Sequence, residues 1–216
     1  MNEVATSVFV KGEKALYAPK GEPAIIDVPP MRFFMVDGVG DPNEPAGAYA
    51  QAVSLLYALS YTVKMSAKSG NAPQGYFGYG VAPLEGFWRM ADGSEGVDYD
   101  RKSAFAWTAM IRQPDFVTED VLHWAQAEVR RKKKLDAGIA RLAPYAEGLC
   151  VHCLHTGPYS AEPATLARME AFIRANGFTA DIPARRHHEV YLQDPQRTDP
   201  QKLKTILRTP VRQLAV

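Results

Sequence analysis

A carboxylate with histidine and tyrosine neighbours lies in the segment RHHEVYLQDP, near the C-terminal end of the sequence. Alternation along a strand places His187, Glu189 and Tyr191 on one face and His188 with Val190 on the other. Because the second face carries the apolar residues, the first is expected to meet a polar or semi-polar environment. A buried carboxylate there is costly unless it is paired or used, whereas a solvated Glu189 is the simpler alternative.

A second segment that combines an acid with aromatic rings, PLEGFW, supplies Glu85, Phe87 and Trp88. If the two halves of the chain are related by a pseudo-twofold axis, this segment reaches the same central groove as Glu189. Rings attract cations and supply apolar area, and a carboxylate balances the charge, so such a groove suits a flat, often cationic organic molecule. The same carboxylate could serve as a general acid or base.

The elements that must position these residues recur in one order, strand-helix-strand-strand, in both halves of the chain. The halves cover about 31–115 and 146–216, and a helix at about 118–134 joins them. The repeated order of elements supports an internal duplication within a single domain over 1–216.

Three further aromatic residues fall on the predicted elements of the first half. Tyr57 and Tyr61 lie one helical turn apart and can share a face, so they are predicted either to line the groove or to pack the helix on the sheet. Trp107 alternates with Phe105 on one face of a predicted strand. Together with Trp88, these residues are candidate walls of a pocket.

Charge and composition argue against some classes of partner. Lys and Arg number 25 and Asp and Glu 24, which leaves a net charge of +1 and no overall basic field for nucleic acid. The run of cations from Arg130 to Lys134 complements a helix C-terminus, and a nucleic-acid patch is the weaker reading. No stretch approaches the roughly 20 apolar residues of a membrane span, and the charged N-terminus lacks a signal-peptide pattern. We expect a cytoplasmic protein.

The two cysteines form the only spacing that suggests a metal or redox site. Cys150 and Cys153 have a CxxC spacing with His155 nearby, which could bind zinc or cycle as a dithiol. On a strand, however, positions three apart point to opposite faces, which favours two small core residues. A Ser-His-Asp motif, a phosphate loop, a Rossmann fingerprint and HExxH are absent from the sequence, so we expect neither metal nor cofactor.

Several long, collinear strings resemble the GyrI-like small-molecule-binding family, in its branch without a helix-turn-helix extension. They are GVGDPN, LYALSYTVKM, PLEGFW, WTAMIRQPDFVT, EGLCVHCLHTGPYSAEP, HHEVYLQDP and KLKTILRTPV. The resemblance covers most of the chain. It implies a pseudo-symmetric α+β fold, in which two strand-helix-strand-strand modules form an antiparallel sheet with a central ligand groove. In relatives that sense drugs, an acid on a central strand engages cationic ligands among aromatic residues.

The branch that carries PLEGFW and HHEVYL includes proteins that look like hydrolases of cyclopropanoid, DNA-alkylating compounds. The resemblance implies Glu189 as general base or electrostatic stabiliser, and Tyr191 as hydrogen-bond donor to the developing phenolate. It implies wall residues Trp88, Tyr57, Tyr61, Phe87 and Trp107, with Glu85 and His155 as assistants. Whether Glu85 or Glu189 carries the chemistry stays open, as do the oligomeric state and the alternative of a protein that sequesters drugs without turnover.

Overall fold

The structure, a computed structural model of the chain, describes residues 9–10, 12–94, 98, 100–182 and 186–214. Its strands are β1 (Ala24–Val28), β2 (Met31–Val39), β3 (Leu84–Met90), β4 (Phe105–Gln113), β5 (Arg141–Tyr145), β6 (Gly148–Thr156), β7 (Phe178–Ala180), β8 (His187–Tyr191) and β9 (Lys204–Gln213). Its helices are α1 (Lys14–Tyr17), α2 (Ala48–Lys64), α3 (Glu119–Lys133) and α4 (Glu162–Ala175), with 3-10 turns η2 (Ser66–Ser69), η3 (Lys102–Ala104), η4 (Tyr159–Ala161) and η5 (Pro200–Lys202).

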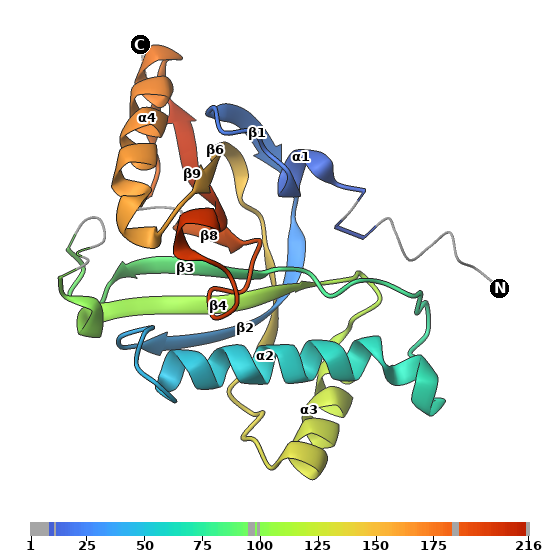
Figure 1. Cartoon of the computed structure of the whole chain (residues 1–216). Helices are drawn as coiled ribbons and strands as arrows, with labels where there is room; N and C mark the ends of the chain where they lie inside the picture. The colour runs from blue at the N-terminus through green and yellow to red at the C-terminus, as the bar shows by residue number, and fades with distance from the viewer. Residues whose placement is uncertain (1–8, 11, 95–97, 99, 183–185, 215–216) are drawn as a thin grey trace.

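The described strands pair in the order β1-β6-β9-β8-β3-β4-β2-β5, and β7 pairs with β9 (Figure 1). Every pairing in this order is antiparallel. β3 and β8 form the central pair of the sheet. Beyond β3 the sheet continues through β4 to β2, and beyond β8 it continues through β9 to β6. Along the chain, α2 follows β2 in the first half and α4 follows β6 in the second, so the two helices are equivalent. The α+β class with a large antiparallel sheet, predicted from the sequence, is confirmed.

One face of the sheet packs against α2, α3 and α4, and we call it the helix face. The apolar spacing of α2 buries Leu55, Leu56 and Leu59, which join a core that includes Trp88 and Trp107. On the other half, α4 packs against β6, β7 and β9. Burial of the apolar faces of these helices against the sheet, rather than helix propensity alone, stabilises their positions.

The opposite face, which we call the far face, is covered in part by the N-terminal segment. Leu16 and Tyr17 of α1 share a buried cluster with Phe33, Phe87 and Val190 of the sheet. The two faces of the central strands therefore have different neighbours: long helices on the helix face, and the start of the chain on the far face.

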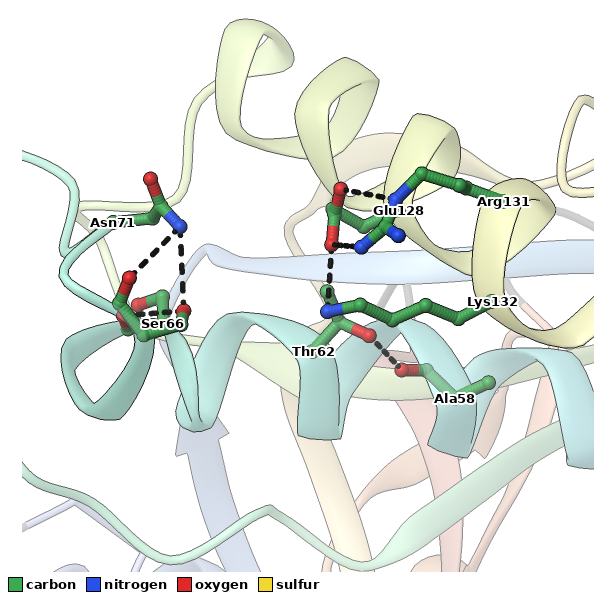
Figure 2. A network of polar contacts seen from close by, with 8 residues as sticks. Ala58, Thr62, Ser66, Asn71, Glu128, Arg131 and Lys132 are labelled. Atoms are coloured by element: carbon green, nitrogen blue, oxygen red, sulfur yellow. Dashed lines mark hydrogen bonds and ion pairs between the residues drawn. The ribbon is translucent and has the colours of Figure 1, made fainter.

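The connecting helix α3 begins and ends as the sequence predicts. Thr118 accepts a hydrogen bond from the Val121 backbone amide at the N-terminus. Glu128 pairs with Arg131 at 2.9 Å and with Lys132 at 2.6 Å within the basic last turns (Figure 2). Hydrogen bonds from these two cations lower the pKa of Glu128 to about 2. Two cations of the basic run are thus engaged within their own helix.

The length and hydropathy of the described helices show whether any of them could cross a membrane. None of them combines the length and the apolar character that crossing a bilayer requires.

Candidate functional site

Glu85 and Glu189 lie on neighbouring strands but on opposite faces of the sheet. The register of β3 with β8 pairs Gly86 with Glu189 and Glu85 with Val190. Directly paired residues share a face, so Glu189 lies on the helix face and Glu85 on the far face. The expectation that both carboxylates reach one groove is wrong, because an offset of one residue reverses the face of a side chain.

On the helix face, Glu189 ends a chain of two hydrogen bonds. Trp88 Nε1 donates to Tyr191 Oη at 2.7 Å, and Tyr191 Oη donates to Glu189 Oε2 at 2.8 Å. His187 Nε2 lies 3.5 Å from the other carboxylate oxygen, Oε1. Glu189 and Trp88 are each 8% exposed. These four residues, named the Glu189 cluster, hold a carboxylate in a fixed orientation at the edge of a buried aromatic region.

Rings from three elements surround the Glu189 cluster. Tyr49, at the start of α2, packs between Trp88 and Trp107, with ring centroids 5.2 Å and 5.1 Å away. Tyr159 of η4 presents its edge to Tyr191 at 6.0 Å. Trp88 and Trp107, predicted as walls, do lie together here. Sequence reasoning missed Tyr49 and Tyr159; Tyr49 heads the helical apolar pattern, and Tyr159 follows a Gly-Pro turn.

Burial among these rings raises the pKa of three tyrosines, namely Tyr49, Tyr159 and Tyr191, and the negative charge of Glu189 raises each further. Their hydroxyls therefore stay protonated at neutral pH and act as hydrogen-bond donors. The site pairs a carboxylate acceptor with several phenolic donors.

The outer part of the site carries a second acid. Burial raises the pKa of Tyr57, and Tyr61 and Asp194 add to that rise. Asp194 acts in the same direction on Tyr159, so its charge reaches rings from both halves of the chain. The Tyr57 and Tyr61 ring centroids are 6.4 Å apart, and Tyr61 is 50% exposed. Asp194, in the loop after β8, is a residue that sequence reasoning missed.

Gly86 gives the Glu189 cluster its room. A Cβ at this position would lie 3.0 Å from Trp88 Nε1 and 3.2 Å from Tyr191 Oη, tighter than ordinary contacts. Because Gly86 is directly opposite Glu189 in the sheet, its missing side chain lets the indole and the phenol approach each other above the backbone. Close packing of Trp88 and Tyr191 therefore explains why a glycine occupies this position of PLEGFW.

Two other residues predicted for the groove lie elsewhere. Phe87 is on the far face, where its ring centroid is 4.8 Å from those of Tyr145 and His188. His155 is on the helix face, but its ring nitrogens lie 2.9 Å from Thr165 Oγ1 and 3.2 Å from the Pro158 carbonyl. His155 thereby ties β6 to α4, and the structure gives Phe87 a place in the far-face core.

Comparison with known proteins assigns the family. The model of the GyrI-like small molecule binding domain matches residues 21–212. The chain belongs to the GyrI-like family. A hydrolase from Listeria innocua is similar to it at 45% identity, covering 94% of this chain and 98% of the other, with a TM-score of 0.85.

Two further solved structures extend the comparison of this GyrI-like domain. An uncharacterized conserved protein from Listeria innocua shares 46% identity over 94% of this chain and 98% of its own, with a TM-score of 0.87. The EcmrR C-terminal domain shares only the fold, at 11% identity over 89% of this chain and 98% of its own, with a TM-score of 0.51. The comparison with curated proteins gives no significant match.

The far face of this GyrI-like domain carries a separate polar network around His188. His188 Nδ1 lies 3.0 Å from both carboxylate oxygens of Glu147, and Nε2 lies 2.9 Å from Glu85 Oε2. Tyr17 Oη donates to Glu85 Oε1 at 3.1 Å, and Arg208 Nη1 lies 3.5 Å from Glu147. Two carboxylates thus face two cationic groups in a region that is sealed from water.

The pKa shifts in this far-face network follow from its charges. Burial opposes protonation of His188, but the carboxylates of Glu147 and Glu85 outweigh it and raise its pKa to about 9. Burial also opposes ionisation of Glu147, yet His188 and Arg208 keep its pKa below the usual value. His188 and Glu147 are therefore both charged at neutral pH and stabilise each other, an arrangement that suits structural support.

The cysteines occupy two different cores of the GyrI-like domain. Cys150 packs on the far face with Val28 and Ile206, whereas Cys153 packs under α4 and its Sγ donates to the Gly21 carbonyl. The two thiols point to opposite faces, as alternation along a strand requires. Within the described ranges, no group of three or more His, Cys, Asp or Glu residues has a geometry that could hold a metal ion.

Proposed function

We propose that this GyrI-like domain binds flat, aromatic, often cationic molecules at the Glu189 cluster and hydrolyses cyclopropanoid DNA-alkylating compounds there. The observation that carries the proposal is the carboxylate of Glu189, held by Tyr191 and Trp88 among buried rings. The 45% identity to a hydrolase over most of both chains supports an enzymatic activity. The sequence strings PLEGFW and HHEVYL point to the cyclopropanoid class.

Binding in this proposal depends on the rings and acids at the outer edge of the site. In this proposal Tyr57 and Tyr159 contact the ligand, and Asp194 adds a second negative charge that raises the pKa of both tyrosines. A flat cation gains apolar contact and cation–π attraction from the rings, and the two carboxylates offset its charge. Tyr61, half exposed at the next turn of α2, extends this wall.

The proposed reaction adds one water molecule to the strained ring. Glu189 Oε1 accepts a proton from water, because Oε2 is already occupied by the Tyr191 hydroxyl. The water oxygen forms a bond to the least substituted cyclopropane carbon, the ring C–C bond breaks, and its electron pair passes into the conjugated carbonyl, which becomes a phenolate. The proton on Glu189 then returns through solvent to the phenolate oxygen, so atoms and charge balance.

Tyr191 has two successive tasks in this scheme. It first orients Glu189, since its single hydroxyl hydrogen points at Oε2. Once Glu189 holds the proton from water, the carboxyl becomes a weaker acceptor, and the hydroxyl is free to donate to the developing phenolate. Trp88, which donates to Tyr191 Oη, keeps the phenol in reach of both partners.

Product formation tests this proposal. Wild-type protein should convert a cyclopropanoid to its ring-opened, hydrated product, measured by mass spectrometry. Glu189→Gln should slow conversion about 10²- to 10⁴-fold, because it removes the proton acceptor while it keeps an oxygen for Tyr191. Glu170→Gln, at an exposed carboxylate of α4, is the matched control and should leave the rate unchanged. Equal rates for wild type and Glu189→Gln would overturn the catalytic role.

Sequestration without turnover is the alternative, favoured by the hydrogen bond and the nearby imidazole that already engage the two oxygens of Glu189. Binding of a rhodamine-type cation, followed by fluorescence polarisation, separates the two. If the carboxylate faces the ligand, Glu189→Ala should weaken dye binding. Dye binding that depends on Glu189, without any hydrated product from wild-type protein, would leave sequestration as the function.

A further inference from the structure

A hollow lies on the far face, at the opposite side of the sheet from Glu189. This cavity of about 320 Å³ is formed where β2, β3 and β4 run alongside the residue that precedes β8. It lies within the size range of small-molecule pockets, toward the lower end. The residues that line it are Asp37, Gly38, Val39, Phe87, Arg89, Ala106, Trp107, Thr108 and Arg186.

Alternation along the strands explains why the hollow exists. Asp37, Thr108 and Phe87 form one row across β2, β4 and β3, and Val39, Ala106 and Arg89 form the next. Ala106 is small, so the second row leaves space between its two larger neighbours. The cavity is therefore built into the sheet by residue size.

Two arginines face each other across this hollow. Continuing the β3–β8 register by one residue places Arg89 opposite Arg186. Arg186 Nη1 donates to Thr108 Oγ1 at 2.8 Å, and its guanidinium lies 5.9 Å from the centre of the Phe87 ring. Like charges at facing positions of neighbouring strands repel each other. Within the part of the chain that the structure describes, neither arginine has an ion pair with a carboxylate.

The one acid in the cavity does not cancel this charge. Arg141 Nη1 lies 2.5 Å from Asp37 Oδ2, and the Thr108 hydroxyl donates to Asp37 Oδ1. The charge of Asp37 acts on both Arg141 and Arg186, and among the described residues at the cavity these two arginines and Arg89 outweigh it to leave a net charge of +2. Guanidinium groups present paired donors that fit the oxygens of phosphate and carboxylate groups.

We propose that this far-face cavity binds a small organic anion, whose phosphate or carboxylate group bridges Arg89 and Arg186 and whose apolar part contacts Phe87. The volume exceeds that of a bare phosphate ion, and the aromatic wall gives the remaining space an apolar side. Such a ligand would bind on the opposite side of the sheet from the Glu189 cluster.

Calorimetric titration with phenyl phosphate, inorganic phosphate and phenol in a low-salt, phosphate-free buffer tests this site. Phenyl phosphate should bind with one-to-one stoichiometry, more tightly than either of its parts. Arg89→Gln and Arg186→Gln should each weaken that binding about tenfold or more, since each removes a charge-assisted contact. Arg174→Gln, which removes the same charge from the exposed surface of α4, should leave it unchanged.

Thermal unfolding gives an independent readout. Without an anion, Arg89→Gln should raise the melting temperature slightly, because it removes one of two facing like charges. With phenyl phosphate, wild-type protein should gain thermal stability and Arg89→Gln should gain little. The proposal is overturned if phenyl phosphate gives no heat at millimolar concentration, if phenol or inorganic phosphate binds equally well, or if Arg89→Gln alone lowers the melting temperature.

Discussion

The two faces of the central β3–β8 pair carry the same kinds of side chain in different arrangements. On the helix face, one carboxylate, Glu189, contacts a phenol and an imidazole beside a wall of rings. On the far face, Glu85 also contacts a phenol and an imidazole, Tyr17 and His188. There, a second acid and an arginine complete the set, and the charges balance.

The difference lies in what remains available to a ligand. His188 is fully buried between two carboxylates, so its ring nitrogens are out of reach of a ligand. Among the described residues, Glu189 Oε1 has no close hydrogen bond, and the charge of this carboxylate acts on the half-buried Tyr49 and Tyr159. A balanced network stabilises one structure, whereas an unbalanced carboxylate among rings can respond to a ligand.

The largest effect on stability should come from removing the cation on the far face. His188→Gln leaves Glu85 and Glu147 buried without their shared positive partner, and we expect a loss of about 3–5 kcal/mol in the free energy of unfolding. Glu189→Gln should lose less than about 1 kcal/mol, because the amide oxygen still accepts the Tyr191 hydrogen. Urea denaturation measures both, and equal losses would contradict the contrast between the faces.

The pH dependence of stability should report on the same histidine. Because the pKa of His188 is raised to about 9 in the folded protein, its contribution is complete below its unfolded pKa. That unfolded value is about 6.5, and the contribution, about 3 kcal/mol, disappears as the pH rises through about 9. Unfolding free energies across this alkaline range should fall in wild-type protein.

The control for this pH dependence is His188→Gln, which has no titrating imidazole and should lack that alkaline fall. The lowered pKa of Glu147 acts in the opposite window, since its contribution is present above its ordinary value and is lost as the pH falls through the depressed one. A wild-type profile that stays flat from neutral to alkaline pH would show that His188 is not protonated in the folded state.

A smaller effect is expected where the helix face is most tightly packed. Gly86→Ala pushes a methyl group against Trp88 Nε1 and Tyr191 Oη, and such overpacking costs about 1–3 kcal/mol. Dye affinity should fall at the same time, because the Trp88–Tyr191 hydrogen bond is displaced. Gly80→Ala, which meets no atom within 4 Å, is the matched control. If both alanines behave alike, Gly86 does not hold the cluster together.

The mildest test compares one hydroxyl on each face. Tyr17→Phe removes the hydrogen bond to Glu85, and Tyr191→Phe removes the one to Glu189. A hydrogen bond contributes about 1 kcal/mol net to stability, so Tyr17→Phe should lower the free energy of unfolding by about that amount and leave dye binding intact. Tyr191→Phe should alter dye binding and turnover more than stability. The reverse pattern would exchange the roles assigned to the two faces.

Much of the helix face follows from local sequence pattern. Strand alternation correctly groups Glu189 with Tyr191 and His187, and separates them from Val190. Alternation in PLEGFW likewise separates Trp88 from Phe87. Alternation within a strand does not show how β3 pairs with β8, because the two strands lie about a hundred residues apart in the sequence. The register of this pair places Glu85 and Glu189 on opposite faces.

The far-face network lay outside the reach of sequence patterns. Tyr17, Glu85, Glu147, His188 and Arg208 come from distant parts of the chain, so no local pattern shows that they meet. Tyr49 and Asp194 were missed for a related reason, since the place of Tyr49 beside Glu189 and that of Asp194 near Tyr57 depend on how a helix and a loop lie across the sheet.

The sequence by itself determined the longer helices, the two sets of strands, their repeated order and the side of each strand that a residue occupies, because these depend on the period of a helix or a strand. The short elements α1, β1, β5 and β7 were not predicted. Only the tertiary structure decided which strands pair and in what register. A single-residue offset across β3 and β8 therefore separated a structural carboxylate, Glu85, from an available one, Glu189.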